Sequence, residues 1–97
     1  MRVYFHPEAE KEFQAAIRYY EECQPGLGLD FAEEVYAAIT RIIEYPCAWT
    51  AFSANTRRCM ANRFPYGIIY RVESDSLHII AIANLNRRPK YWKKRKS

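Results

Sequence analysis

The sequence predicts an α+β domain in which a helical hairpin packs on one face of an antiparallel sheet. Two apolar stripes with helical spacing lie within residues 8–44, and three segments rich in strand-forming residues lie between residues 57 and 83. A short strand-like run precedes both regions. Helices and strands that are separated along the chain are typical of the α+β class. The predicted order is therefore β-α-α-β-β-β, followed by a basic tail.

The first strand is predicted at Arg2 to Phe5, where β-branched and aromatic residues are concentrated. Pro7 should end this strand and begin a helix, because proline lacks a backbone N–H and is tolerated in the first helical turn. The apolar stripe along one face of this helix consists of Ala9, Phe13, Ala16, Ile17 and Tyr20. A proline and two glycines within residues 24–28 should end the helix.

A second helix is predicted to follow at once and to end before Pro46. Its apolar face consists of Phe31, Val35, Ala38, Ile39 and Ile42. Two amphipathic helices joined by a short loop form an αα-hairpin. The periodic pattern is lost over residues 46–55, which we interpret as a loop with aromatic anchors.

Three strands are predicted at residues 57–63, 66–73 and 77–83, with turn signals between them. In the middle strand, alternation predicts that one set of side chains faces the helices and the other set faces away. The set facing the helices is Ile68, Tyr70 and Val72, and the opposite set is Ile69, Arg71 and Glu73. The opposite face is mixed in character, so we expect it to be partly open.

Charge divides the chain into an acidic half and a basic half. Residues 1–48 contain 4 Lys/Arg and 9 Asp/Glu, whereas residues 49–97 contain 11 and 2. Seven of the ten residues from 87 to 96 are cationic, and two of the others are aromatic. Such a segment suits an anionic partner, which could be nucleic acid, an acidic protein surface or an acidic inhibitor peptide. The alternative is a solvated tail whose aromatic residues pack on the sheet.

Length and composition predict a single domain over residues 1–97. No run of 18 apolar residues and no signal-peptide pattern is present, so we expect a cytoplasmic protein without membrane contact. Three cysteines without CxxC spacing make a disulfide framework or a zinc site improbable. The sequence contains none of the common phosphate-binding or nucleophile motifs, and we expect no cofactor and no metal.

Five segments carry a resemblance to a known family. They are residues 6–10 (HPEAE), 19–21 (YYE), 25–28 (PGLG), 64–72 (FPYGIIYRV) and 87–92 (RRPKYW). Together and in this order they resemble the ParE/RelE superfamily of toxins from type II toxin–antitoxin systems, most closely its ParE, or plasmid-stabilisation, branch. The likeness covers essentially the whole chain, and it implies the same β-α-α-β-β-β fold.

The resemblance also implies a bacterial toxin that is neutralised by a cognate antitoxin in a hetero-oligomeric complex. The antitoxins of this superfamily wrap the toxin with an extended C-terminal segment that is often acidic. ParE-like members act on DNA gyrase and block replication, whereas RelE-like members cut messenger RNA at the ribosome. The expected function is therefore gyrase inhibition, with ribosome-dependent RNA cutting as the alternative.

RNA cutting without a metal needs a base, an acid and cations that stabilise the transition state. If this chain cuts RNA, the resemblance assigns these roles to Arg58, Arg87 and Tyr91. Two positions where RNA-cutting relatives carry cations are occupied here by Gly67 and Met60. This departure favours a gyrase-binding toxin that is not an enzyme.

Binding to a target depends on anchors such as Tyr, Trp and Arg. The residues expected to contact the target are Arg57, Arg58, Arg71, Arg87, Arg88, Tyr91 and Trp92. Those expected to contact the antitoxin are Tyr19, Arg71 and Arg87. We expect Arg71 to share the open face with the tail and with one of Arg57 and Arg58. A third hypothesis is a nucleic-acid-binding module that stacks bases on Tyr70, Tyr91 or Trp92.

Overall fold

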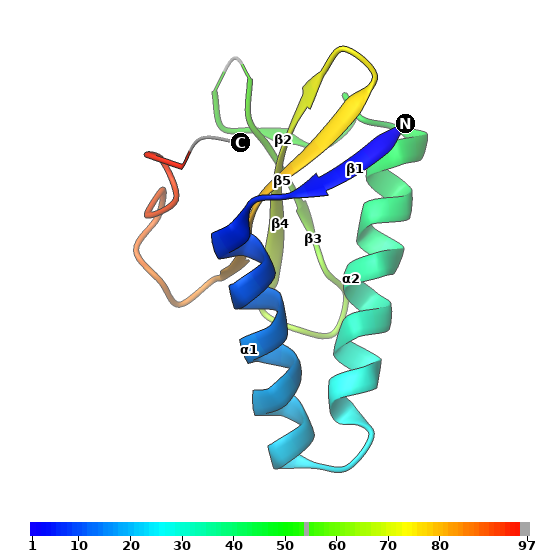
Figure 1. Ribbon diagram of the computed structural model, residues 1–97, viewed down its shortest axis with the longest axis vertical. Helices are drawn as coiled ribbons and strands as arrows, with labels where there is room; N and C mark the ends of the chain where they lie inside the picture. The colour runs from blue at the N-terminus through cyan, green and yellow to red at the C-terminus, as the bar shows by residue number, and fades with distance from the viewer. Residues whose placement is uncertain (54, 96–97) are drawn as a thin grey trace.

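The structure is a computed structural model that describes residues 1–53 and 55–95 (Figure 1). In chain order its elements are β1 (Arg2–Phe5), α1 (Pro7–Cys23), α2 (Leu27–Glu44), β2 (Thr50–Ala51), β3 (Arg57–Met60), β4 (Tyr66–Glu73) and β5 (Ser76–Asn84). The predicted α+β fold is confirmed. The last two residues of the basic tail, 96 and 97, lie outside the described residues.

Helix α1 begins where the sequence predicts, and its first turn is capped by a side chain. Nδ1 of His6 accepts a hydrogen bond from the backbone N–H of Glu8 at 3.0 Å, and Pro7 is the first helical residue. The carboxylates of Glu8 and Glu10 lie in the first turn, where they are favoured by the helix dipole. His6 thus has a structural role as the residue that starts the helix.

The loop between the helices is held by Glu21. Its carboxylate accepts hydrogen bonds from the backbone N–H groups of Gly26, at 3.0 and 3.1 Å, and of Gly28, at 3.1 Å. Gly26 has a φ of 89°, a conformation that glycine adopts without strain. A Cβ atom at Gly28 would lie only 2.7 Å from the backbone oxygen of Ile17. The two helices therefore approach each other through this glycine.

We predict that Gly28→Ala lowers the free energy of unfolding by about 1–3 kcal/mol, because the helices must move apart. In an uncrowded helical position the same change would stabilise the protein by up to about 1 kcal/mol. Urea denaturation therefore distinguishes the two effects, because crowding lowers the free energy of unfolding and helix propensity raises it. A stabilised variant would show that the helices separate at no cost.

The five strands form one sheet in the order β1-β5-β4-β3-β2. The strands β2 to β5 pair in antiparallel fashion, as predicted for the last three of them, whereas β1 runs parallel to β5 and makes the sheet mixed rather than antiparallel. Two further details differ from the prediction. Strand β2 lies inside the segment interpreted as a loop, and β3 ends at Met60 rather than at residue 63. Arg63 has a φ of 71°, which is incompatible with an extended strand.

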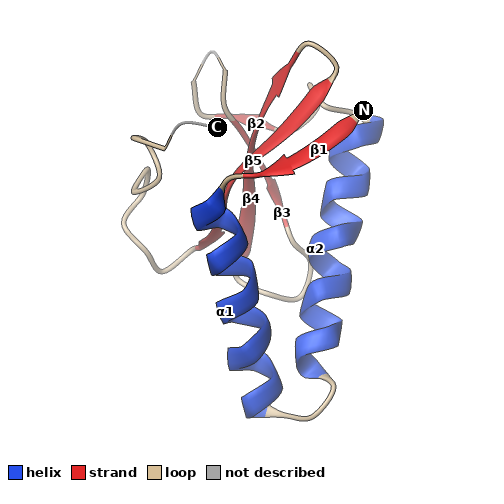
Figure 2. Cartoon of the chain, viewed as in Figure 1, coloured by secondary structure: helices blue, strands red, loops and turns tan. Residues whose placement is uncertain are grey.

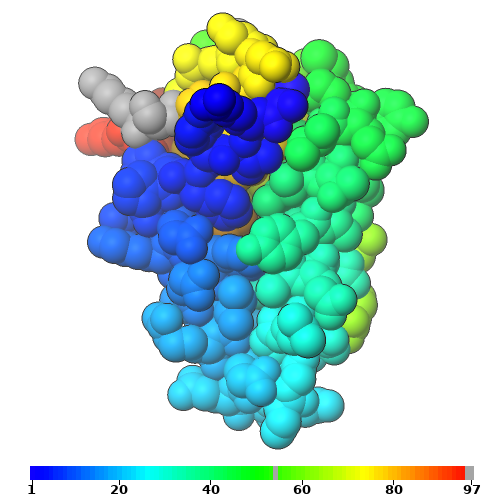
Figure 3. Space-filling view, turned by 45° about the vertical axis from the view of Figure 1, so that its right-hand side comes forward, coloured from blue at the N-terminus to red at the C-terminus, as the bar shows by residue number. Residues whose placement is uncertain are grey.

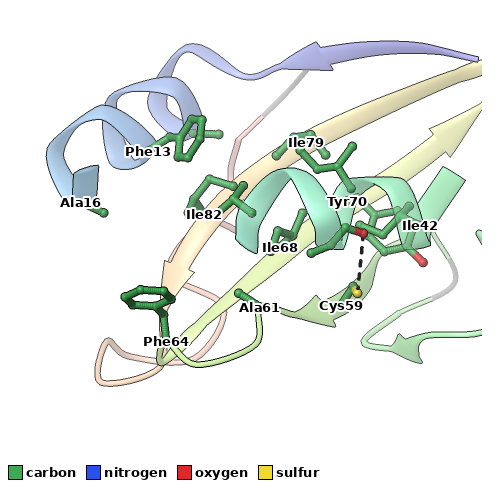
Figure 4. Close-up of a cluster of buried hydrophobic side chains, with 14 of the residues drawn as sticks. Phe13, Ala16, Ile42, Cys59, Ala61, Phe64, Ile68, Tyr70, Ile79 and Ile82 are labelled. Carbon is green, nitrogen blue, oxygen red and sulfur yellow. Dashed lines mark hydrogen bonds between the residues drawn. The ribbon is translucent and has the colours of Figure 1, made fainter. Parts of the chain in front are cut away.

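The two helices lie side by side over one face of the sheet (Figures 2 and 3). The main core fills the space between them and the strands, where Ile68, Ile79 and Ile82 point toward the helices (Figure 4). Tyr70 is also buried there, and its hydroxyl donates a hydrogen bond to the backbone oxygen of Pro46 at 2.6 Å. Burial raises the pKa of Tyr70 to about 12. Val72 was predicted to face this core, but it is 38% exposed because it lies one residue from the end of β4.

A smaller core covers the opposite face of the sheet, so the prediction of a partly open face is wrong in this region. Its buried members are Ile69, Ile80, Ala81, Ala83 and Trp92. A β-bulge opposite Ile69 and Tyr70 brings the consecutive residues Ile80 and Ala81 to the same face. Trp92 belongs to the basic tail, so the tail itself closes this face.

Cys59 is buried under α2, whereas Cys23 and Cys47 are exposed, and all three thiols are free. Over residues 1–53 and 55–95, neither helix has both the length and the apolar character needed to span a bilayer. The same residues contain no group of three or more His, Cys, Asp or Glu side chains that could hold a metal ion.

Candidate functional site

The basic tail folds back on the sheet beside the start of α1 (Figure 1). It contains no helix or strand up to Arg95, and it is held mainly by its side chains. Trp92 is only 8% exposed, and its ring lies 5.8 Å from that of Phe52. The alternative in which the tail aromatics pack on the sheet is therefore the one that the structure adopts.

The tail is fastened by Glu12, which lies on α1 and is 14% exposed at its side chain. Its carboxylate accepts a hydrogen bond of 2.6 Å from the hydroxyl of Tyr91. The guanidinium of Arg95 binds both carboxylate oxygens, at 2.8 and 2.9 Å, in bidentate geometry. Nη1 of Arg87 lies 3.4 Å from the same carboxylate. One helix side chain thus contacts three residues of the tail.

Tyr91 is half-buried among charged groups. The guanidinium carbons of Arg87 and Arg95 lie 3.7 and 5.1 Å from the centre of its ring. Burial raises the pKa of Tyr91 far above its ordinary value, and the hydrogen bond to Glu12 raises it further. At neutral pH the hydroxyl is therefore protonated and donates to Glu12. A proton held this firmly is poorly suited to general acid catalysis.

This raised pKa predicts a loss of stability in alkali. The folded pKa of Tyr91 lies above the value of 10.0 for the free side chain, so its contribution is complete below pH 10 and falls as pH rises above it. Between pH 10 and 12 the free energy of unfolding of the parent protein should fall as pH rises. In Tyr91→Phe this fall should be smaller by about 0.5–1 kcal/mol per pH unit, after allowance for solvent screening. Urea unfolding of both proteins across this range measures the difference. Parallel decline of the two curves would contradict the assignment.

The folded tail and the second face of the sheet enclose a pocket of about 240 Å³. Phe52, Ile69 and Trp92 line it with apolar surface, and cationic side chains of the tail, among them Arg88 and Lys90, line it as well. The pocket therefore combines aromatic surface with positive charge. This combination suits an anionic partner that also offers an apolar or planar group.

Arg58 lines the same pocket from strand β3. Its aliphatic part lies over Gly67, where a Cβ atom would come within 3.0 Å of Cγ and Cδ of Arg58. Its guanidinium carbon lies 5.1 Å from the centre of the Phe52 ring. Among the described residues, Nε of Arg58 is buried and has no hydrogen-bond partner. A buried donor without an acceptor is costly, so the Arg58 side chain would gain free energy if its guanidinium moved to meet an acceptor.

The structure brings together most of the predicted target-binding residues. Arg58, Arg87, Arg88, Tyr91 and Trp92 all line this pocket, which we call the tail pocket. They include the three residues that would act in RNA cutting. A longer side chain at position 67 would compete with Arg58 for space.

Three other predicted residues lie outside the tail pocket. Arg57 points to the helix side, where its Nη1 donates to the backbone oxygen of Trp49 at 2.8 Å. Arg71 shares the face of Ile69 by strand alternation, and it forms an ion pair of 2.7 Å with Glu73. Tyr19 is 60% exposed on α1, with its ring 5.2 Å from that of Tyr20. Of the two arginines that could share a face with Arg71, Arg58 is the one that does.

Sequence reasoning missed Glu12, Phe52 and Arg95. Glu12 lies among the acidic residues at the start of α1, yet its position between Ala9 and Ala16 is next to the apolar stripe. That spacing is a weak signal that the carboxylate faces the protein. Phe52 fell in the segment without periodicity, and Arg95 was one cation among many.

Comparison with known proteins agrees with the fold described above. A family model described as "ParE toxin of type II toxin-antitoxin system, parDE" matches residues 3–89. A solved structure described as "Chromosomal ParDE TA system from P. aeruginosa" superposes with a TM-score of 0.75 at 16% sequence identity. The match covers 89% of this chain and 97% of that chain, and at this identity it shows a common fold. No curated protein matches the sequence significantly.

Proposed function

Since the chain belongs to the family of ParE toxins of type II toxin–antitoxin systems, we propose that it inhibits DNA gyrase by binding to it in the cytoplasm. The observation that carries this proposal is the tail pocket. In it, Arg58 and Arg88 present positive charge beside the aromatic surface of Trp92. Arginine and aromatic residues in a preformed site are effective interface anchors, and they need no bond-making chemistry.

RNA cutting is the second candidate, because Arg58, Arg87 and Tyr91 line the same pocket. It is disfavoured by the state of two of these residues. The hydroxyl of Tyr91 donates a hydrogen bond to Glu12, and burial holds the pKa of Tyr91 far above its ordinary value. The guanidinium of Arg87 lies against Glu12 and over the Tyr91 ring. Both would have to leave Glu12 before they could act on a phosphate group.

We further propose that an antitoxin neutralises the protein by covering the tail pocket with an acidic segment. A carboxylate of that segment would pair with the guanidinium of Arg58, whose Nε has no acceptor among the described residues. The exposed cations of the tail would add long-range attraction and accelerate association. Binding should therefore weaken as the salt concentration rises.

The experiment that tests the function follows two activities of the purified protein in parallel. We expect it to inhibit supercoiling by gyrase and to accumulate cleaved DNA, while messenger RNA on ribosomes stays intact. In cells, thymidine incorporation should stop before methionine incorporation. Fragmented messenger RNA with unaffected gyrase would instead establish the second candidate. Nucleic-acid binding without either effect, and without neutralisation by an antitoxin, would indicate a binding module.

A further inference from the structure

Strand β5 has an outer edge that β1 covers only in part. Strand β1 pairs with residues 76–79, and the last backbone hydrogen bond on this side joins the N–H of His6 to the oxygen of Ile79 at 2.9 Å. Beyond that point the edge is completed by two side chains. Glu12 accepts from the N–H of Ile82, and Arg95 donates to the oxygen of Ile80, both at 3.1 Å. Since Glu12 and Arg95 are also paired with each other, they replace the peptide groups that another strand would supply.

The backbone of the tail contributes little to its own position. Leu85 donates to the oxygen of Pro65 at 2.9 Å, and the later backbone hydrogen bonds in the described tail join residues that are three apart in the sequence. Exposed cations, among them Arg88, Lys90 and Lys94, surround this segment and repel one another. Trp92 and the contacts with Glu12 must therefore hold the tail on the sheet.

We propose that Glu12 is the positioning residue of the site: it keeps the basic tail folded along β5, so that the tail forms one wall of the tail pocket. This inference rests on the proposed function where it concerns gyrase, but the folding of the tail can be measured separately. Without Glu12, the same positive charges would belong to a mobile extension. The fixed wall, rather than charge alone, is what makes the site specific.

Trypsin provides a direct test, because it cleaves after the exposed residues Lys90, Lys93 and Lys94 when the tail is released. In Glu12→Gln the amide oxygen can still accept a hydrogen bond from the N–H of Ile82. The amide N–H groups, however, face the N–H donors of Arg95, and two donors cannot form a hydrogen bond with each other. We expect cleavage within the tail to become about tenfold faster or more. Glu10→Gln removes the same charge from an exposed site on the same helix, and it should leave the cleavage rate unchanged.

A tail that is equally protected in Glu12→Gln and in the parent protein would overturn the proposal. If Glu12→Gln destabilises the whole domain, then Arg95→Gln decides, because it removes the other half of the pair without changing α1. Rapid cleavage confined to the tail of Arg95→Gln supports the role of the pair, and a protected tail overturns it.

Gyrase inhibition measured on the same samples separates the two proposals. A parent protein with a protected tail and no effect on gyrase would contradict the proposed function and leave the role of Glu12 in folding the tail intact. A Glu12→Gln variant with a released tail and undiminished gyrase inhibition would overturn the claim that the fixed wall is needed. We expect a released tail and inhibition at least about tenfold weaker.

Discussion

Replacing Arg87 and Arg88 together by alanine is expected to weaken inhibition of the target by about 30-fold or more. Both side chains line the tail pocket, and a buried interface arginine commonly contributes about 2 kcal/mol to binding. Arg87 also packs on the Tyr91 ring, with its guanidinium carbon 3.7 Å from the ring centre. Concentration series in the gyrase assay, with growth inhibition in cells beside it, measure the loss.

The matched control replaces Arg2 and Arg18, which removes the same charge from β1 and α1, outside the tail pocket. It should leave inhibition within about threefold of the parent protein. Arg88→Ala alone then separates direct contact from release of the tail, because Arg88 is exposed and Arg87 keeps its contact with Glu12. Equal losses in the tail and control variants would indicate misfolding or a different site.

Phe31→Ala is expected to lower the free energy of unfolding by about 3–5 kcal/mol, a large part of the stability of a domain of this size. Phe31 is 0% exposed on α2 and lies at the centre of an aromatic cluster. The ring centres around it belong to Tyr66 at 4.9 Å, Tyr20 and Phe64 at 5.2 Å, and Phe13 at 6.1 Å. Removal of the ring leaves a cavity between two helices and the β3–β4 loop.

Urea denaturation followed by circular dichroism measures this loss. Leu29→Ala is the control, because Leu29 lies on the same helix and is 65% exposed, so its effect should stay within about 0.5 kcal/mol. A loss below about 1 kcal/mol for Phe31→Ala would mean that the surrounding rings close the cavity.

The helices were the most predictable part of the fold, because a 3.6-residue apolar period is visible in a single segment. Phe13 and Phe31 were assigned to the core from that period alone, and both are buried. Strand β2 was missed because it is two residues long and has no period to detect. The parallel pairing of β1 with β5 was missed for another reason, since it joins residues about 74 positions apart and no local pattern specifies such a partner.

The candidate site was predictable in composition but not in arrangement. The sequence singled out the arginines and aromatics of the tail, and most of them line the tail pocket. Which of Arg57 and Arg58 shares the face of Arg71 depends on strand register. A register shift of one residue moves every side chain of a strand to the opposite face. Glu12 was missed because its partners lie 70–83 residues away, in β5 and in a tail without regular structure.

The contact between Glu12 and Arg95 also bears on when the protein becomes active. These residues are 83 positions apart, and β1 likewise needs β5, so the sheet and the tail pocket form only once almost the whole chain is available. Contacts between distant parts of a chain slow folding, because the intervening loop must close first. During synthesis the helical hairpin emerges long before its covering strands. We therefore expect a ribosome-bound chain that stops short of residue 95 to be inert, which gives an antitoxin made alongside it time to reach the toxin before the toxin can act.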